Sequence, residues 1–428
     1  MSDDATPVTD GGESVADAAD ADPEDSPAIR RLADWDADRL SDIADEHDTP
    51  LYVTDLDRVA ENCARLRAAF PDADLRYAVK ANTARAVLEA VRDAGLGAEC
   101  ASAGEVRRAL DAGFDGDDVD YTAVNPPERD LDAVVEWWED GADLTITVGA
   151  ADTLDRLRER GYDGRVCVRA NPGVGAGHHE KVRTGGAAKF GVPAERVAEV
   201  FASARPDFDV VGLHAHAGSG IHGDEDLAAH REFLARVADL AGDVGDLEYV
   251  NVGGGIGVPY RDDEEPLDLD AVAAAIREEL DGLDARLALE PGRYVVADAA
   301  VLLTRVNTVK GAPNELVAGV DAGMTDLLRP AMYDAFHEIR SLEPDSVDRE
   351  EAPVTVAGPI CESGDTFCEG RPLPVPERGD LLALGNVGAY GYEMASTYNS
   401  RPRPADVSLA GELLRERESL ADLTRLER

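Results

Sequence analysis

The segment LRYAVKANTARAVLEAVRDAG, residues 75–95, sets the pattern that determines the fold of this chain. It opens with a short apolar run, typical of a buried strand, and continues with apolar residues at helical spacing up to a glycine, which commonly ends a helix. Such runs occur eight times, as LRYAV (75–79), AEC (98–100), VDYTAV (119–124), LTITV (144–148), RVCVRA (165–170), VVGLHAH (210–216), EYVNV (248–252) and RLALE (286–290). Stretches with helical periodicity separate them.

Eight strand and helix units in succession predict a closed parallel barrel, the TIM (β/α)8 fold. An open doubly wound sheet is the competing interpretation of the same alternation. After Arg293 the sequence becomes rich in β-branched residues and is punctuated by Gly and Pro, as in AVLLTRVNTVKG (300–311). This composition predicts a second, β-rich domain of sandwich-like or barrel-like form. The predicted fold class is therefore α/β, a TIM barrel with a β-rich second domain.

Composition divides the chain into four predicted segments. Residues 1–28 hold nine acidic residues and no base, so we expect a disordered acidic tail. Residues 29–74 are predicted to form an N-terminal segment that partly joins the β domain and leads into the barrel. The barrel itself is assigned to residues 75–300, and the C-terminal β domain to residues 301–428. A chain of 428 residues exceeds the usual size of one hydrophobic core, which agrees with two domains.

Acidic residues outnumber basic ones by 88 to 42, and the formal net charge is −46. Such a surface repels phosphate backbones and anionic lipids, so we expect neither nucleic acid nor a membrane as a partner. Acids occur in every segment and lysines are few, a pattern that suits a high-salt cytoplasm, where screening is strong. The N-terminus has no basic region followed by an apolar stretch, and no segment reaches the roughly 20 apolar residues of a membrane span. We therefore expect a cytoplasmic protein.

The cysteines give no sign of a structural framework. They are Cys63, Cys100, Cys167, Cys361 and Cys368, and none forms a CxxC pair. The sequence therefore predicts neither disulfides nor a zinc site, and we expect no metal.

Reactive side chains gather where four of the predicted strands end. Lys80 follows the first strand, and His214 and His216 end the sixth. The turn GGGIG (253–257) follows the seventh strand, and EPGR (290–293) ends the eighth. Because reactive groups of a parallel barrel collect at the carboxyl ends of its strands, we expect one site built from all four.

Each feature has a plainer interpretation when it is considered alone. A lysine at a strand end can lose its proton and form a Schiff base with a carbonyl cofactor, but isolated lysines are usually surface or ion-pairing residues. The glycines of the turn at 253–257 offer backbone N–H groups to a phosphate, but a tight turn needs the same residues. The two histidines lack further metal-ligand partners and could be ordinary core residues.

The combination of motifs carries more information than any one of them. They are AVKAN (78–82), HHEKVRTGGAAKFG (178–191), HAHAGSG (214–220), GGGIG (253–257), EPGR (290–293), VDAGMTDLLRPAMYDAFH (320–337), GPICESGD (358–365) and GAYGYEMASTYNSRPRP (388–404). In this order and at these separations, the chain resembles the barrel-type pyridoxal 5'-phosphate (PLP) decarboxylases, and the diaminopimelate decarboxylase family in particular. The resemblance runs from about residue 48 to the C-terminus.

The resemblance implies PLP as the cofactor and assigns its ligands. Lys80 would hold PLP as the internal aldimine, His216 would stack on the pyridine ring, and Glu290 would face the ring nitrogen. A carboxylate there keeps the nitrogen protonated, so that the ring can accept electrons. The remaining implied cofactor-binding residues are Ser219, Gly253, Gly254, Gly255, Pro291, Gly292, Arg293 and Tyr390.

The resemblance also implies a substrate, meso-2,6-diaminopimelate, which would lose carbon dioxide to give L-lysine in the last step of lysine biosynthesis. Arg293, Arg329 and Tyr333 correspond to the family's site for the distal carboxylate, which the planar fork of arginine suits. Glu362 matches the residue that takes the distal ammonium, and Tyr390 one that approaches both cofactor and substrate.

Cys361 is the implied acid of the reaction. In the family, the matching cysteine comes from the neighbouring subunit and protonates the carbon that has lost its carboxylate. The resemblance therefore implies a homodimer in which each active site combines Lys80 of one chain with Cys361 and Glu362 of the other.

Two rival functions stay open at this point. One is decarboxylation of a related diamino acid or polyamine precursor such as ornithine or arginine, and Arg329 and the ESGD sequence after Cys361 argue against it. The other is a non-catalytic PLP-binding relative, which would need neither Lys80 nor Cys361. The segment GNVGAY (385–390) departs from the family at Asn386 and Val387, where an acidic and a small residue are expected, and puts only local packing in doubt.

Overall fold

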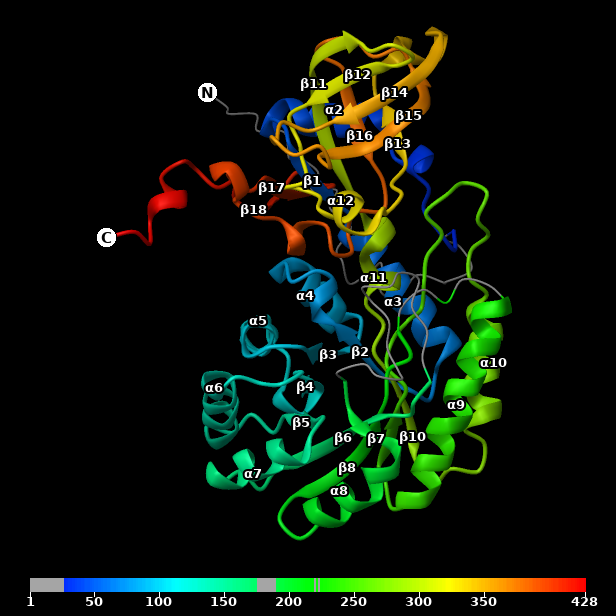
Figure 1. The fold of residues 1–428 in the computed structure, drawn as a ribbon, viewed down its shortest axis with the longest axis vertical. Helices are drawn as coiled ribbons and strands as arrows, with labels where there is room; N and C mark the ends of the chain where they lie inside the picture. The colour runs from blue at the N-terminus through cyan, green and yellow to red at the C-terminus, as the bar shows by residue number, and fades with distance from the viewer. Residues whose placement is uncertain (1–26, 175–189, 219–220, 222–223) are drawn as a thin grey trace, which may run out of the picture.

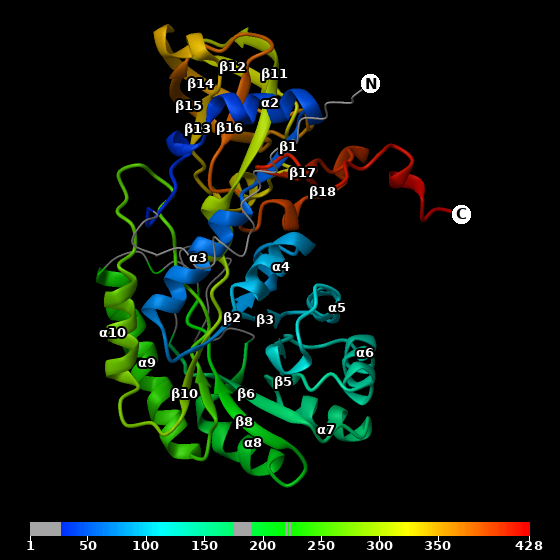
Figure 2. The ribbon, with the colours of Figure 1, turned by 180° about the vertical axis from the view of Figure 1, so that it is seen from behind.

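A computed structural model describes residues 27–174, 190–218, 221 and 224–428 of the chain. A helix-wrapped barrel forms one end of the molecule and a β-rich unit the other, as Figure 1 and the reverse view in Figure 2 show. The predicted acidic tail, residues 1–28, lies almost wholly outside the described residues, and so does most of the motif at 178–191.

Eight parallel strands close into a barrel. They are β2 (Asp74–Ala78), β3 (Gly97–Cys100), β4 (Val119–Tyr121), β5 (Thr145–Val148), β6 (Arg165–Asn171), β8 (Asp209–His214), β9 (Tyr249–Asn251) and β10 (Arg286–Leu289). The order β5-β4-β3-β2-β10-β9-β8-β6 is closed by pairing between β5 and β6, and a two-residue strand, β7 (Val192–Pro193), pairs with β6. Each predicted strand forms, and the closure rules out the open doubly wound sheet.

Helices cover the outside of the barrel (Figure 1). They are α4 (Arg85–Asp93), α5 (Ala103–Asp111), α6 (Glu128–Glu139), α7 (Ala151–Glu159), α8 (Val197–Ala204), α9 (Asp224–Val244) and α10 (Leu269–Glu279). Local signals start several of them: the Ser102 hydroxyl accepts the N–H of Glu105 at α5, and the Asp268 carboxylate accepts the N–H of Ala271 at α10. Each helix buries an apolar stripe, such as Val87, Leu88 and Val91 of α4.

The second unit is a mixed β-sheet, in agreement with the predicted β-rich domain. Its strands are β1 (Leu51–Thr54), β11 (Ala300–Gly311), β12 (Leu316–Val320), β13 (Ile339–Ser341), β14 (Glu351–Ala357), β15 (Thr366–Pro374), β16 (Leu381–Leu384), β17 (Ala405–Ser408) and β18 (Leu413–Arg415). Strand β1 lies between β11 and β17, and α2 (Ala37–His47) packs its buried Leu40 and Ile43 into the core beneath them. The exact segment boundaries that we assigned stay predictions.

Buried polar contacts fix the segments that connect the two units. Helix α3 (Leu56–Ala69) carries Arg58, whose guanidinium pairs with Asp298 at 2.7 Å, and Asn62, whose amide donates to the other oxygen of Asp298 at 2.8 Å. Asp298 follows α11 (Arg293–Val296), which opens with the arginine of EPGR. On the other side, the backbone N–H of Tyr390 donates to the carbonyl of Ala81, at 2.8 Å. These contacts bring residues of the C-terminal half over the carboxyl ends of the strands.

Within the described residues, no helix is long and apolar enough to cross a membrane.

Candidate active site

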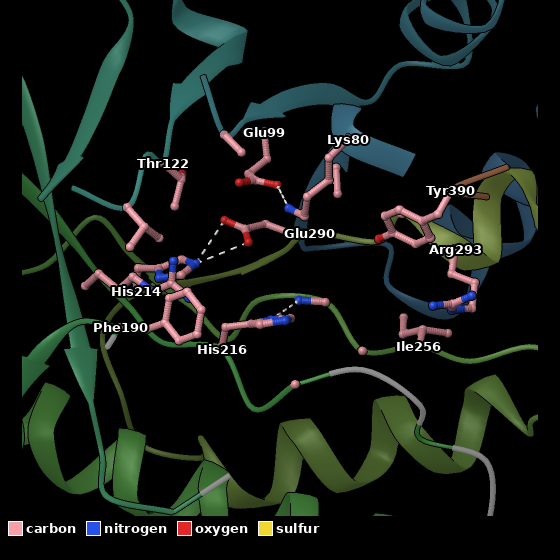
Figure 3. A pocket seen from close by; sticks show the side chains of 18 of the residues that line it. Lys80, Glu99, Thr122, Phe190, His214, His216, Ile256, Glu290, Arg293 and Tyr390 are labelled. Carbon is pink, nitrogen blue, oxygen red and sulfur yellow. Dashed lines mark hydrogen bonds and ion pairs between the residues drawn. The ribbon is translucent and has the colours of Figure 1, made fainter. Parts of the chain in front are cut away.

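A cavity of about 430 Å³ lies at the barrel mouth, where the strands end and residues of the C-terminal half close over them (Figure 3). Residues from all four predicted strand-end groups line it. The lining residues are Ala78, Lys80, Glu99, Ala101, Thr122, Val124, Arg169, Phe190, His214, His216, Gly218, Gly254, Gly255, Ile256, Glu290, Gly292, Arg293, Arg329, Tyr333, Tyr390 and Met394.

Lys80 stands just after β2 and forms an ion pair with Glu99 of the neighbouring strand β3 (Figure 3). Glu99 is buried, whereas the Lys80 side chain is 42% exposed at the cavity wall. Partial desolvation opposes the charge of the ammonium, but Glu99, with Tyr390 and Glu290 next, outweighs it and raises the pKa of Lys80. The cavity therefore offers a primary amine whose charge is matched by a buried acid.

Glu290 directly follows β10 and is held by the last residues of β8 and β9. The His214 Nε2 lies 3.1 and 3.2 Å from its two carboxylate oxygens, and the Asn251 amide donates to it at 2.9 Å. Burial disfavours the carboxylate, yet His214, with Lys80 next, holds the pKa of Glu290 well below its usual range. Glu290 is therefore a fixed negative charge that faces the cavity.

The glycine turn after β9 lies against His216. Gly253 and Gly255 have φ of +74° and +106°, and a Cβ on Gly254 would lie 2.3 Å from the Glu290 carbonyl oxygen. The N–H of Gly254 donates to His216 Nδ1 at 3.1 Å, so the neutral ring carries its proton on Nε2. Burial lowers the pKa of His216 to about 3, which keeps the ring uncharged at neutral pH.

The far end of the cavity is cationic. Arg293 donates to the hydroxyl of Tyr260 at 2.6 Å, and Arg329 lies over the ring of the same tyrosine, 5.0 Å from its centroid. Among the residues that the structure describes, no carboxylate pairs with Arg293 or Arg329. Burial opposes ionisation of Tyr260, but the two guanidinium groups hold its pKa below the usual range. Arg329 is buried and Arg293 is half-buried, and two such cations without an acid favour an anionic ligand.

The residues of the cavity fit PLP. Lys80 supplies the amine that a carbonyl group requires, and Glu290 supplies a carboxylate that stays ionised. In the described part of the chain, the backbone N–H groups of Gly255 and Ile256 donate to no protein acceptor and remain for a phosphate. The tightness of the turn agrees with this use, because a Cβ on Gly255 would lie 2.6 Å from the Gly218 oxygen.

Several predicted site residues lie elsewhere. Cys361 and Glu362 are exposed and do not line the cavity of their own chain. At the surface, the Asn399 amide donates to the Cys361 sulfur at 3.2 Å, and the Tyr398 hydroxyl donates to the Glu362 carboxylate at 2.5 Å. Ser219 falls outside the described residues.

Pro291 and Gly253 support the site without lining the cavity. The Pro291 carbonyl accepts the N–H of Ala78, and the Gly253 N–H donates to Asn251. The departure at 386–387 is accommodated locally, since the Asn386 amide donates to the Pro259 carbonyl at 3.0 Å and Val387 is buried.

Some residues of the site escaped the sequence analysis. Glu99 is the middle residue of the apolar run AEC, and an acid inside a buried strand is an unusual feature that could have flagged it. Tyr260 and Arg169 stand in stretches without a motif. Arg169 lies in the cavity wall with its guanidinium over the Phe190 ring, 5.1 Å from the centroid, and burial lowers its pKa. Only the folded arrangement identifies these residues.

Comparisons with known proteins agree with this site. The family model "Pyridoxal-dependent decarboxylase, pyridoxal binding domain" matches residues 56–297. Diaminopimelate decarboxylase of Methanothermobacter thermautotrophicus is 43% identical, over 90% of this chain and 92% of its own length, and that of Deinococcus radiodurans is 39% identical, over 90% and 97%.

A solved structure of diaminopimelate decarboxylase from Helicobacter pylori, complexed with L-lysine, superposes with a TM-score of 0.84. It is 34% identical in sequence, and the match covers 91% of this chain and 99% of that one. Lysine/ornithine decarboxylase from Vibrio vulnificus superposes with a TM-score of 0.77 at 21% identity, which shows a shared fold.

Proposed function

Since the chain belongs to the diaminopimelate decarboxylase family of pyridoxal-dependent decarboxylases, we propose that it converts meso-2,6-diaminopimelate to L-lysine and carbon dioxide, the last step of lysine biosynthesis. The observation that carries the proposal is the cationic end of the cavity. Arg293 and Arg329 lie there without an acid among the described residues. The distal end of diaminopimelate carries a second carboxylate beside its ammonium, and this carboxylate would pair with them, whereas the side chains of ornithine and arginine end in a cation alone.

PLP supplies the electron sink for decarboxylation when it is bound. In our proposal, Lys80 would hold it, His216 would lie against its ring, and Glu290 would keep the ring nitrogen protonated. The fixed charge of Glu290 supports this role, because His214 and Asn251 orient the carboxylate. The glycine turn, together with Ser219, would bind the phosphate.

The distal end would orient the substrate. Arg293, Arg329 and Tyr333 would bind the carboxylate that is retained in the product, and Tyr390 would lie between cofactor and substrate. Arg293 supports this arrangement, because its guanidinium stands over the Tyr390 ring, 5.0 Å from the centroid. The carboxylate that leaves is thus placed at the cofactor end.

We further propose a homodimer with shared active sites. Cys361 and Glu362 are exposed and do not line the cavity of their own chain. In the dimer, Cys361 of the partner subunit would protonate the substrate carbon, and Glu362 of the partner subunit would bind the distal ammonium. A chain alone would then lack its acid.

Hybrid dimers test the shared site. Lys80→Ala and Cys361→Ala proteins are each expected to be inactive, and reassociation of an equal mixture makes half of the dimers hybrid. Each hybrid has one intact site, so about a quarter of the wild-type activity should return. Absence of recovery, with exchange proven by differently tagged subunits, would contradict the shared site.

We also propose that the protein works in a high-salt cytoplasm. Its net charge of −46 requires screening to limit self-repulsion. Melting temperatures in 0.1 M and 2 M salt provide the test, and a temperature that does not rise with salt contradicts the proposal.

The function itself is tested by carbon dioxide release from PLP-loaded protein in molar salt. Diaminopimelate, ornithine, arginine and lysine are compared at equal concentration, and we expect a strong preference for diaminopimelate. A preference for ornithine or arginine would overturn the substrate, and no release from any of the four would favour a non-catalytic relative.

A further inference from the structure

We propose that His337 is a positioning residue for substrate selection: it holds the Arg329 guanidinium in place for the distal carboxylate without neutralising its charge. The proposal rests on the proposed function, because it concerns the same carboxylate site. His337 does not line the cavity, so it would act through Arg329.

Two hydrogen bonds define the state of the His337 ring. Its Nδ1 lies 2.9 Å from the Gly385 carbonyl oxygen, which can only accept, so Nδ1 carries the proton. Its Nε2 lies 3.0 Å from Arg329 Nη1, which can only donate, so Nε2 is the acceptor. The ring is therefore a neutral relay from the 385 carbonyl to the guanidinium.

The Arg329 guanidinium is held from two sides. His337 accepts from one corner, and the Tyr260 ring lies beneath the group. Tyr260 itself contacts the His337 ring edge to face, with centroids 5.6 Å apart and an interplanar angle of 90°. Both Arg329 and His337 are buried, so the arrangement lies in a packed environment.

A neutral acceptor suits this position better than an acid. An aspartate or glutamate beside Arg329 would orient the guanidinium equally well, but it would also pair with its charge and compete with the substrate carboxylate. Burial, together with Arg329, lowers the pKa of His337 to about 3, so the ring stays neutral in the working range of pH. No acid therefore matches the charge of Arg329 among the described residues, and the N–H donors that His337 and the Tyr260 hydroxyl do not take remain for the ligand.

Two near-isosteric substitutions separate the functions of the two ring nitrogens. In His337→Gln, the side-chain oxygen can take the place of Nε2 and accept from Arg329. In His337→Asn, the amide can take the place of Nδ1 and donate to Gly385, but the acceptor for Arg329 is lost. Both substitutions keep residue 337 polar. The Gln variant loses the contact to Gly385, and the Asn variant loses the contact to Arg329.

The ligands are chosen to isolate the carboxylate site. L-Lysine and 1,5-diaminopentane have the same two amines, and only lysine has a carboxylate. Their dissociation constants from the PLP-loaded holoenzyme, measured by the change in cofactor absorbance, report this contact, as does the KM for diaminopimelate. We expect His337→Asn to raise the KM and the lysine constant roughly tenfold. The 1,5-diaminopentane constant, kcat and cofactor absorbance should stay nearly unchanged, and His337→Gln should recover most of the loss.

The proposal is overturned if the constants of both ligands rise together, or if Gln and Asn variants behave alike. An Arg329→Met background provides a second test, because there His337→Asn should have no further effect on lysine binding; an additive loss would show that His337 does not act through Arg329. Binding of the two amines requires no turnover. If wild-type protein does not decarboxylate diaminopimelate, the proposed function fails. If His337→Asn binds lysine over 1,5-diaminopentane with the same preference as the wild type, only the present proposal fails.

Discussion

The two ends of the cavity handle buried charge in opposite ways. At the cofactor end, the amine and the two acids are matched: Lys80 pairs with Glu99, and Glu290 is held by His214. At the distal end, Arg293 and Arg329 are supported by the neutral side chains of Tyr260 and His337.

At the cofactor end the protein itself balances the charges of Lys80 and Glu290, whereas at the distal end the charges of the two arginines are left for a ligand to balance. A matched charge pair stays stable in the absence of ligand, whereas an unmatched buried cation gains from each anion that reaches it. The distal end is therefore the part of the cavity that can select a substrate by its carboxylate.

The largest effect is expected from removal of the amine at the cofactor end. Lys80→Ala should abolish the absorbance of lysine-linked cofactor and lower activity on the order of a thousandfold or more, because no other amine lies in the cavity wall that the structure describes. Lys310→Ala, at an exposed position of β11, is the matched control and should leave both unchanged. An active Lys80→Ala protein with the absorbance intact would refute the assignment.

The distal end should show a large effect of a different kind. Arg329→Met removes one of the two cations, and kcat/KM for diaminopimelate should fall roughly a hundredfold to a thousandfold while the cofactor absorbance persists. The exposed Arg85→Met on α4 serves as the control. If the variant also loses its cofactor, the two ends are not separable in the way that the comparison supposes.

Removal of Glu99, the acid that pairs with Lys80, tests whether the charges at the cofactor end are matched. Glu99 raises the pKa of Lys80, so Glu99→Gln should lower that pKa and expose the neutral amine at lower pH. Capture of PLP by the apoprotein at neutral pH should then be faster, by roughly tenfold for each pKa unit lost. The rate of appearance of cofactor absorbance between pH 6 and 10 is the measurement, and an unshifted profile would contradict the role of Glu99.

The smallest effect concerns stability in acid at the distal end. His337 binds a proton near pH 6.5 in the unfolded chain and near pH 3 in the folded protein, so acidification between these values favours the unfolded state. Each pH unit in that window lowers the free energy of unfolding by about 1.4 kcal/mol, so the total loss at pH 5 is about 2 kcal/mol. His337→Gln lacks this cost. Urea unfolding of both proteins at pH 7 and pH 5 should show the wild type losing more stability, and an equal loss would argue against a buried neutral ring.

Much of the cofactor end could be predicted because its residues mark strand ends. Lys80 and the glycine turn follow, and His216 and Glu290 end, an apolar run that the alternation identifies as a strand, and parallel strands end at the same face of a barrel. The residues that escaped prediction carry no such local mark. His337 closes a recognised motif, but its contacts to Gly385 and Arg329 cannot be inferred from the motif itself.

The sequence by itself determined the eight strands, their helices, the β-rich second unit and the order of motifs that identifies the family. These features depend on periodicity and spacing along the chain, which are local properties. Only the tertiary structure decided that Glu99 meets Lys80, that Tyr260 lies between two arginines, and that Cys361 lies outside its own cavity. Closure of the barrel and docking of the C-terminal half create those neighbours, and the electrostatic environment of each group follows from burial and from neighbours far away in the sequence.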